Sequence, residues 1–238
     1  MDGALPDLAI SERVGQRALL HVWLSPAFPV GAFAYSHGLE QAVERGWVRD
    51  RATVQAWLED LVSHGSLGND LVLLAGAWRA TMDGDAPALR AVAELSSALQ
   101  PSAERHLETT QQGRSFIAAM ASAWPSPAVA ALEGVSAACD VGYPVAVGSA
   151  TAGHGVGLSD TLTAYALAFV SNLASAAIRL SVVGQIDGQR IVAGMMPAVE
   201  RAVQRAAASS LDDLGSATMR ADISSLAHET QYSRLFRS

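Results

Sequence analysis

The feature that most constrains the fold is a series of segments with helical spacing of apolar residues, separated only by short breaks. The breaks carry Gly or Pro, and no stretch sustains the alternation of apolar and polar residues that a half-buried strand shows. Half of the 238 residues are hydrophobic and only 6% are aromatic, and alanine, the best helix former, dominates. We therefore predict an all-α protein, a single-domain helical bundle of about ten helices.

The same signals predict where the helices lie and how the chain is organised. Asp50 and Ser102 are expected to cap the helices that follow them, and Pro87 to open another. The organisation we expect is a flexible N-terminus over residues 1–10, an all-α domain over 11–218 and a flexible C-terminal tail over 219–238. Helices are expected over residues 12–24, 33–45, 51–64, 71–82, 87–99, 103–124, 129–139, 144–151, 160–183 and 191–210.

One stretch, residues 25–40, is unusual enough to serve as a reference point, and we call it the corner. Its sequence is S-P-A-F-P-V-G-A-F-A-Y-S-H-G-L-E. Pro26 and Pro29 cannot lie inside a helix, and Gly31 allows backbone angles that other residues avoid. From Phe33 onward the pattern indicates a helix. The corner is therefore expected to be a shaped turn between two helices.

Composition excludes several classes of function. The net charge is −7, every basic residue is Arg, and no basic block occurs, so nucleic acid is not an expected partner. The single cysteine, Cys139, excludes an intrachain disulfide. The N-terminus is acidic and polar, unlike a secretory signal, and a cytoplasmic location is expected.

An uncharged run over residues 161–178 reaches the length of a membrane span. It consists largely of Ala, Ser, Thr and Asn, which contribute little transfer energy. A buried core helix is therefore the preferred interpretation, and a membrane-associated protein is the alternative.

The sequence presents no strong catalytic or metal-binding motif. The six histidines lack paired ligand spacing, and the nearest pair, His37 with Glu40, is expected to be a structural contact on one helical face. The glycine-rich loop 153–157 has neither a preceding strand nor a following Lys, so it does not fit a phosphate cradle. We predict no catalytic residue, no metal site and no cofactor of the chain's own.

Two features suggest interfaces. Arg179 closes an apolar helix, where the helix dipole alone favours a cation, but a polar cluster beginning at Gln185 follows at once. The tail mixes aromatic, Leu and Arg residues, a composition typical of interfaces, although a disordered end is the alternative.

Three segments together resemble the UreF family of urease accessory proteins: the corner, R-L-S-V-V-G-Q at 179–185, and H-E-T-Q-Y-S-R-L-F-R-S at 228–238. The resemblance covers nearly the whole chain. It implies an all-α homodimer without enzyme activity that bridges UreD (also called UreH) and the nickel-carrying GTPase UreG. That assembly delivers nickel to the urease apoprotein and couples the delivery to GTP hydrolysis, so that the partner GTPase handles both nickel and GTP.

By motif position, the resemblance also implies roles for particular residues. Those on or near the UreG or dimer surfaces would be Phe33, Tyr35, His37, Glu40, Arg179 and Gln185. Those of the tail that orders against UreD/UreH would be His228, Glu229, Tyr232, Arg234, Leu235, Phe236 and Arg237. A further implied role is that Glu40 influences the UreG site.

The chain departs from the family pattern at one position. The family commonly has Arg before the His-Glu pair, where this chain has Ala227, and this removes one expected tail contact. The alternative to a scaffold is a small helical enzyme with a site built from His37, Glu40 and Arg179.

Overall fold

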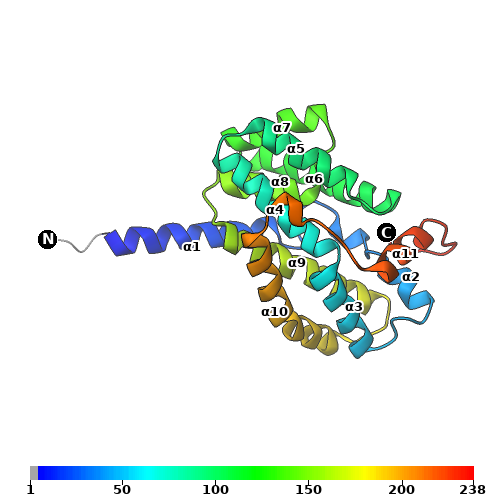
Figure 1. Cartoon of the computed structure of the whole chain (residues 1–238). Coiled ribbons are helices and arrows are strands. Elements are labelled where there is room, and N and C mark those ends of the chain that lie inside the picture. Colours follow the sequence, from blue (N-terminus) through cyan, green and yellow to red (C-terminus); the bar gives the residue numbers. More distant parts are fainter. Residues whose placement is uncertain (1–4) are drawn as a thin grey trace.

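The computed structural model describes residues 5–238, and every regular element in that range is helical (Figure 1). The prediction of a single all-α bundle is thereby confirmed. The first half contains α1 (Leu5–Trp23), the 3₁₀ helix η1 (Ala32–Ala34), α2 (Leu39–Glu44), α3 (Arg51–His64), α4 (Ser66–Met82), α5 (Ala86–Ala98) and α6 (Ala103–Ala123). The second half contains α7 (Pro127–Ala138), α8 (Tyr143–Gly153), α9 (Leu158–Arg179), α10 (Gln185–Ala208), the 3₁₀ helix η2 (Leu211–Asp213) and α11 (Met219–His228).

The centre of the bundle is the pair α4 and α8. Their close approach depends on Gly148, because a β-carbon there would lie 2.3 Å from the carbonyl oxygen of Leu74. Helices α5, α6 and α7 surround α8 on one side, and α3, α9 and α10 pack on the other side of α4 (Figure 1). Helix α1 extends away from the body, and α2 and α11 lie together at the opposite end (Figure 1).

The predicted caps are present. The Asp50 carboxylate accepts a 2.9 Å hydrogen bond from the amide of Thr53, whose hydroxyl in turn accepts from the amide of Asp50. Ser102 caps α6 through the amide of Arg105. The helix expected over residues 160–183 begins earlier, because Gly157 is the N-cap of α9 and Leu158 its first residue.

The apolar run 161–178 lies within α9. By length and composition α9 could cross a membrane, but more than half of the tested window is buried inside the fold. Helices α10 and α4 pack against it. This arrangement fits the core-helix interpretation.

The expected helix over residues 33–45 was wrong. The chain forms only the short η1, extends at Tyr35 (φ −124°, ψ 140°), and passes through left-handed conformations at His37 (φ 54°) and Gly38 (φ 75°) before α2 begins. The physical reason is that the backbone of Ser36 and Ala34 hydrogen-bonds with the last two residues of the tail instead of forming helical bonds.

Both predicted end segments contain helical residues. Residues 1–4 of the expected flexible N-terminus lie outside the described residues, and residues 5–10 belong to α1. The tail carries α11, which packs against α2 and α6. Its last residues lie on the corner.

Candidate functional site

Glu40, in the first turn of α2, is the main contact between the corner and the tail. Its carboxylate accepts hydrogen bonds from the amides of Leu235 (2.6 Å) and Phe236 (2.9 Å). The same group lies 3.1 Å from Nε2 of His228. Because Glu40 is only 7% exposed, these contacts are largely shielded from water and hold the tail in a defined position.

His228 ends α11 and is fully buried between two carboxylates. Its Nδ1 lies 2.7 Å from Glu104 of α6, opposite the Glu40 contact. A neutral imidazole has only one N–H donor. Both contacts with carboxylates are therefore hydrogen bonds only when each ring nitrogen carries a hydrogen. Arg234 adds a 2.7 Å ion pair to Glu104. We call Glu40, Glu104, His228 and Arg234 the Glu40 cluster.

A second buried group, the Glu108 cluster, consists of His37, Arg105, Glu108 and Ser238. Glu108 lies 2.5 Å from Arg105 and 2.8 Å from Nε2 of His37, and it accepts a 2.8 Å hydrogen bond from the Ser238 hydroxyl. Burial alone would raise the pKa of Glu108, but Arg105, His37 and Ser238 outweigh it and bring the pKa to about 2. Burial, assisted by Arg105, lowers the pKa of His37.

The end of the tail pairs directly with the corner backbone. The amide of Arg237 donates to the carbonyl of Ala34 (2.8 Å), and the amide of Ser36 donates to the carbonyl of Ser238 (2.8 Å). The Ser36 hydroxyl donates to the same carbonyl. The tail is therefore fixed on the body by three sets of contacts. These are the Glu40 cluster, the Glu108 cluster and this backbone pairing.

Arg179 links the corner, the tail and the end of α9. Its guanidinium donates a 2.5 Å hydrogen bond to the carbonyl of Phe33 and lies 4.3 Å from the centre of the Phe236 ring. This geometry is that of a cation–π contact. Arg179 thus covers the buried aromatic ring that anchors the tail.

The predicted site residues fall into three groups. Tyr35, His37 and Glu40 are brought together with the tail, and Tyr35 donates a 2.6 Å hydrogen bond to Gln111. Gln185 lies apart and exposed at the start of α10. Phe33 is 65% exposed.

The tail residues divide into buried and exposed sets. His228 and Phe236 are buried, whereas Arg234 and Arg237 are exposed. The Glu229 carboxylate accepts from the amide of Ala103 at the start of α6 (2.8 Å). Tyr232 and Leu235 project into solvent.

Three important residues escaped the sequence analysis: Glu104, Arg105 and Glu108, all on α6. Glu104 and Glu108 are four apart and therefore share a helical face, but carboxylates at this spacing are common on exposed helices. The predicted His37–Glu40 contact was wrong. Each residue bonds elsewhere, because α2 begins only at Leu39.

The geometry does not assemble the alternative enzyme site. His37 contacts Glu108 and Arg105, Glu40 contacts His228, and Arg179 contacts Phe33 and Phe236. A nucleophile must be within hydrogen-bond reach of its base, and a third group must orient the base. His37, Glu40 and Arg179 instead contact other residues and do not form such a series of hydrogen bonds.

One Ser-His-acid grouping does occur elsewhere. The Ser97 hydroxyl lies 2.8 Å from Nε2 of His106, but Asp140 approaches the same nitrogen at 3.8 Å. A triad needs the acid on the other ring nitrogen, where it orients the base. The grouping therefore lacks the geometry of a nucleophilic site. Among the described residues, no group of three or more His, Cys, Asp or Glu side chains could hold a metal ion.

A cavity adjoins the Glu108 cluster, and we call it the corner pocket. Its volume is about 660 Å³, and it lies between α1, the corner, α6 and α9. Its apolar walls include Leu20, Leu24, Phe28, Val30, Leu167 and Phe169. Its polar lining, which is buried or half-buried, includes His37, Asp70, Arg105, Glu108, Tyr143 and Tyr165.

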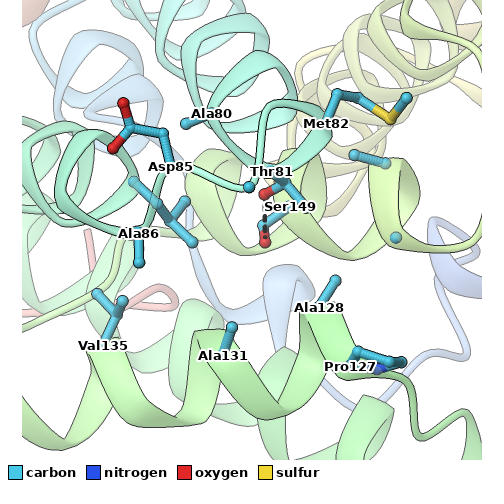
Figure 2. Close-up of a pocket in the computed structure, with 14 residues that line it drawn as sticks. Ala80, Thr81, Met82, Asp85, Ala86, Pro127, Ala128, Ala131, Val135 and Ser149 are labelled. Carbon is cyan, nitrogen blue, oxygen red and sulfur yellow. Dashed lines mark hydrogen bonds between the residues drawn. The ribbon is translucent and has the colours of Figure 1, made fainter.

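The second cavity, of about 370 Å³, lies between the turn after α4 and the helices α7 and α8 (Figure 2). Small apolar side chains line most of it, and its polar pair, Thr81 and Ser149, is satisfied by a mutual 2.8 Å hydrogen bond. Asp85 at its edge caps α5. This cavity therefore offers no free reactive group.

Comparison with known proteins identifies the family. The family model described as UreF matches residues 48–196. A protein named urease accessory protein UreF from Methylobacterium radiotolerans is 54% identical over 219 residues, which cover 92% of this chain and 95% of the relative. Another of the same name from Rhodopseudomonas palustris (strain BisB5) is 55% identical over 92% of this chain and 90% of the relative.

The similarity to these relatives covers most of the chain, and by name they are accessory proteins rather than enzymes. The chain therefore belongs to the UreF family of urease accessory proteins, and its role lies in urease maturation.

Proposed function

We propose that this protein is a non-catalytic maturation scaffold that bridges UreD/UreH and the GTPase UreG. In this role it couples GTP hydrolysis by UreG to insertion of nickel into the urease apoprotein. It acts as a homodimer in the cytoplasm, and nickel is the cargo of the assembly rather than a resident cofactor of this chain.

The observation that carries the proposal is the two-sided character of the tail. One side is fixed to the body by buried residues, among them His228 and Phe236. The other side exposes large apolar groups: Met219, Ile223, Leu226, Tyr232 and Leu235. The three on α11 are spaced four and three residues apart and so share one helical face. Exposed apolar groups that share one face of an ordered support are typical of a protein-binding surface.

The buried clusters support this role energetically. A segment that is already ordered loses less conformational entropy when a partner binds it than a free segment does. The Glu40 and Glu108 clusters hold the tail in place, so the apolar groups are presented in one arrangement. We assign this face to UreD/UreH.

Phe33, which lines the corner pocket, and Arg179, which bonds to its carbonyl, supply the second surface, and we assign this surface to UreG or to the second protomer. Glu40 is buried beneath the tail, so a direct contact with UreG would require the tail to move. We therefore infer that Glu40 acts as a positioning residue for the tail.

The test is co-purification of UreD/UreH with the double variant Tyr232→Ala, Leu235→Ala. Both side chains are exposed, at 105% and 62%, so the fold is expected to persist while binding falls by at least ~100-fold, as interface anchors do on truncation. Met82→Ala, an exposed apolar residue distant from the tail, is the matched control. Undiminished capture of UreD/UreH by the folded double variant would refute the assignment of this face.

A further inference from the structure

Asp70, in the lining of the corner pocket, is a buried carboxylate that has no ion-pair partner among the described residues. Three carboxylates line the pocket. Asp160 lies 3.3 Å from Arg17, and Glu108 lies 2.5 Å from Arg105. Among the described residues, Asp70 has only a 3.2 Å hydrogen bond from the Tyr165 hydroxyl.

The buried charges of the pocket do not balance. Arg105 is matched by Glu108, and His37, with its pKa lowered chiefly by burial, contributes no positive charge at neutral pH. Asp70 therefore leaves a net negative charge in a cavity shielded from water. A buried carboxylate without a compensating cation is unfavourable, so this site would favour a ligand that brings one.

The walls indicate what kind of cation fits. Phe28 and Phe169 are buried in the wall of the pocket, and Tyr143 and Tyr165 lie with ring centres 5.6 Å apart beside Asp70. Aromatic faces attract organic cations, and they also cover an apolar body. A volume of about 660 Å³ is in the range of sites for small organic molecules.

We propose that the corner pocket binds a small organic cation, a primary ammonium with an apolar or aromatic body. The ammonium would donate to Asp70 and Tyr165, and the body would lie against Phe28 and Phe169. A bare divalent ion fits less well. Such an ion needs several oxygen or nitrogen ligands, and the described residues provide no cluster of three metal-binding side chains here.

The first measurement is calorimetric titration of the full-length protein with benzylammonium at pH 7.5, without any urease component. Benzyl alcohol, which has the same ring but no charge, is the paired probe. We expect saturable binding of benzylammonium and affinity for benzyl alcohol that is at least tenfold weaker. Equal binding of both probes, or no saturable binding of benzylammonium, would overturn the proposal.

Variants locate the site. Asp70→Asn keeps the shape of the side chain and is expected to weaken benzylammonium binding at least tenfold. Asp160→Asn removes a carboxylate at the mouth of the same pocket and is expected to leave the affinity unchanged. Phe169→Leu removes an aromatic ring but keeps an apolar side chain. It is expected to weaken benzylammonium binding several-fold, independently of the carboxylate. Equal losses in Asp160→Asn and Asp70→Asn would indicate nonspecific charge attraction and contradict the proposal.

A titration with Ni²⁺ alone separates the organic cation from a metal. We expect no binding of Ni²⁺ that depends on Asp70. Tight Ni²⁺ binding that is lost in Asp70→Asn would overturn the organic-cation assignment. Because no partner protein is used, failure of this proposal would leave the scaffold proposal untouched.

Discussion

Replacing Glu40 with Ala should release the tail while leaving the bundle folded. The substitution removes the acceptor of three donors: the amides of Leu235 and Phe236 and the imidazole of His228. A buried donor left without its acceptor costs about 1–3 kcal/mol, so loss of all three bonds would weaken the native tail contacts by roughly 3–9 kcal/mol. The loss is an upper limit, because Leu235 is exposed and water can replace part of its bond.

Amide hydrogen exchange measures this loss where it occurs. Exchange at Leu235, Phe236 and Arg237 should accelerate by at least ~100-fold in Glu40→Ala, since 1.4 kcal/mol corresponds to a factor of ten. Amides in the centre of α4 and α8 should keep their protection. The matched control is Glu44→Ala, which removes an exposed carboxylate from the same helix.

The same variant should also lower UreD/UreH binding and urease activation, through disorder of the tail. Unchanged exchange at Leu235 and Phe236 in Glu40→Ala would refute the positioning role. Loss of protection throughout the bundle would instead show that Glu40 supports the whole fold.

Three further predictions concern the same region. Because burial, opposed by Arg105 and the Tyr165 bond, raises the pKa of Asp70 from 3.8 to about 6, the folded state binds this proton more tightly, and stability falls as pH rises from 4 to 6. Asp70→Asn should therefore raise the free energy of unfolding of the ligand-free protein by up to about 3 kcal/mol at pH 8 and leave it unchanged near pH 3.5, as measured by urea unfolding. Equal effects at both pH values would contradict this account. Arg179→Met should lower the free energy of unfolding by about 1–2 kcal/mol, because its contacts with Phe33 and Phe236 are lost. It should also accelerate hydrogen exchange at the tail amides, whereas exchange there would not change if Arg179 were only a surface residue. Gly38→Ala should lower the midpoint of thermal unfolding more than Gly46→Ala does. Both have φ of 70–75°, but only at residue 38 would the added methyl meet α11, 3.0 Å from the amide nitrogen of Ser225; equal effects would refute a close contact there.

Local signals were sufficient for much of the fold. Asp50 and Ser102 cap their helices as predicted, because a cap depends on residues only three positions away. Periodicity identified the bundle for a similar reason. It reports which face each helix buries, without reference to distant parts of the chain.

The corner shows where such signals fail. Residues 33–38 have the composition of a helix start, yet the carbonyl of Ala34 and the amide of Ser36 pair with residues 237 and 238, some two hundred positions away. Local propensity is a weak prior that tertiary contacts override. No pattern within the corner could have indicated that pairing.

The candidate site was found only in part for the same reason. The motifs singled out Glu40, His228 and Phe236, but the residues that complete the clusters, Glu104 and Glu108, lie on a helix with no distinguishing motif. Asp70 likewise belongs to none of the three motifs in the sequence. Its burial beside Tyr165 emerges from the packing of α4 against α9.

The central claim is that this chain bridges UreD/UreH and UreG. Its most direct test is co-expression of the three proteins, followed by measurement of the mass of the purified complex by size-exclusion chromatography with light scattering. We predict one complex containing all three, with UreD/UreH and UreG eluting apart when this chain is omitted. A stable UreD/UreH–UreG complex of the same affinity without this chain, or a mixture in which this chain joins neither protein, would contradict the account.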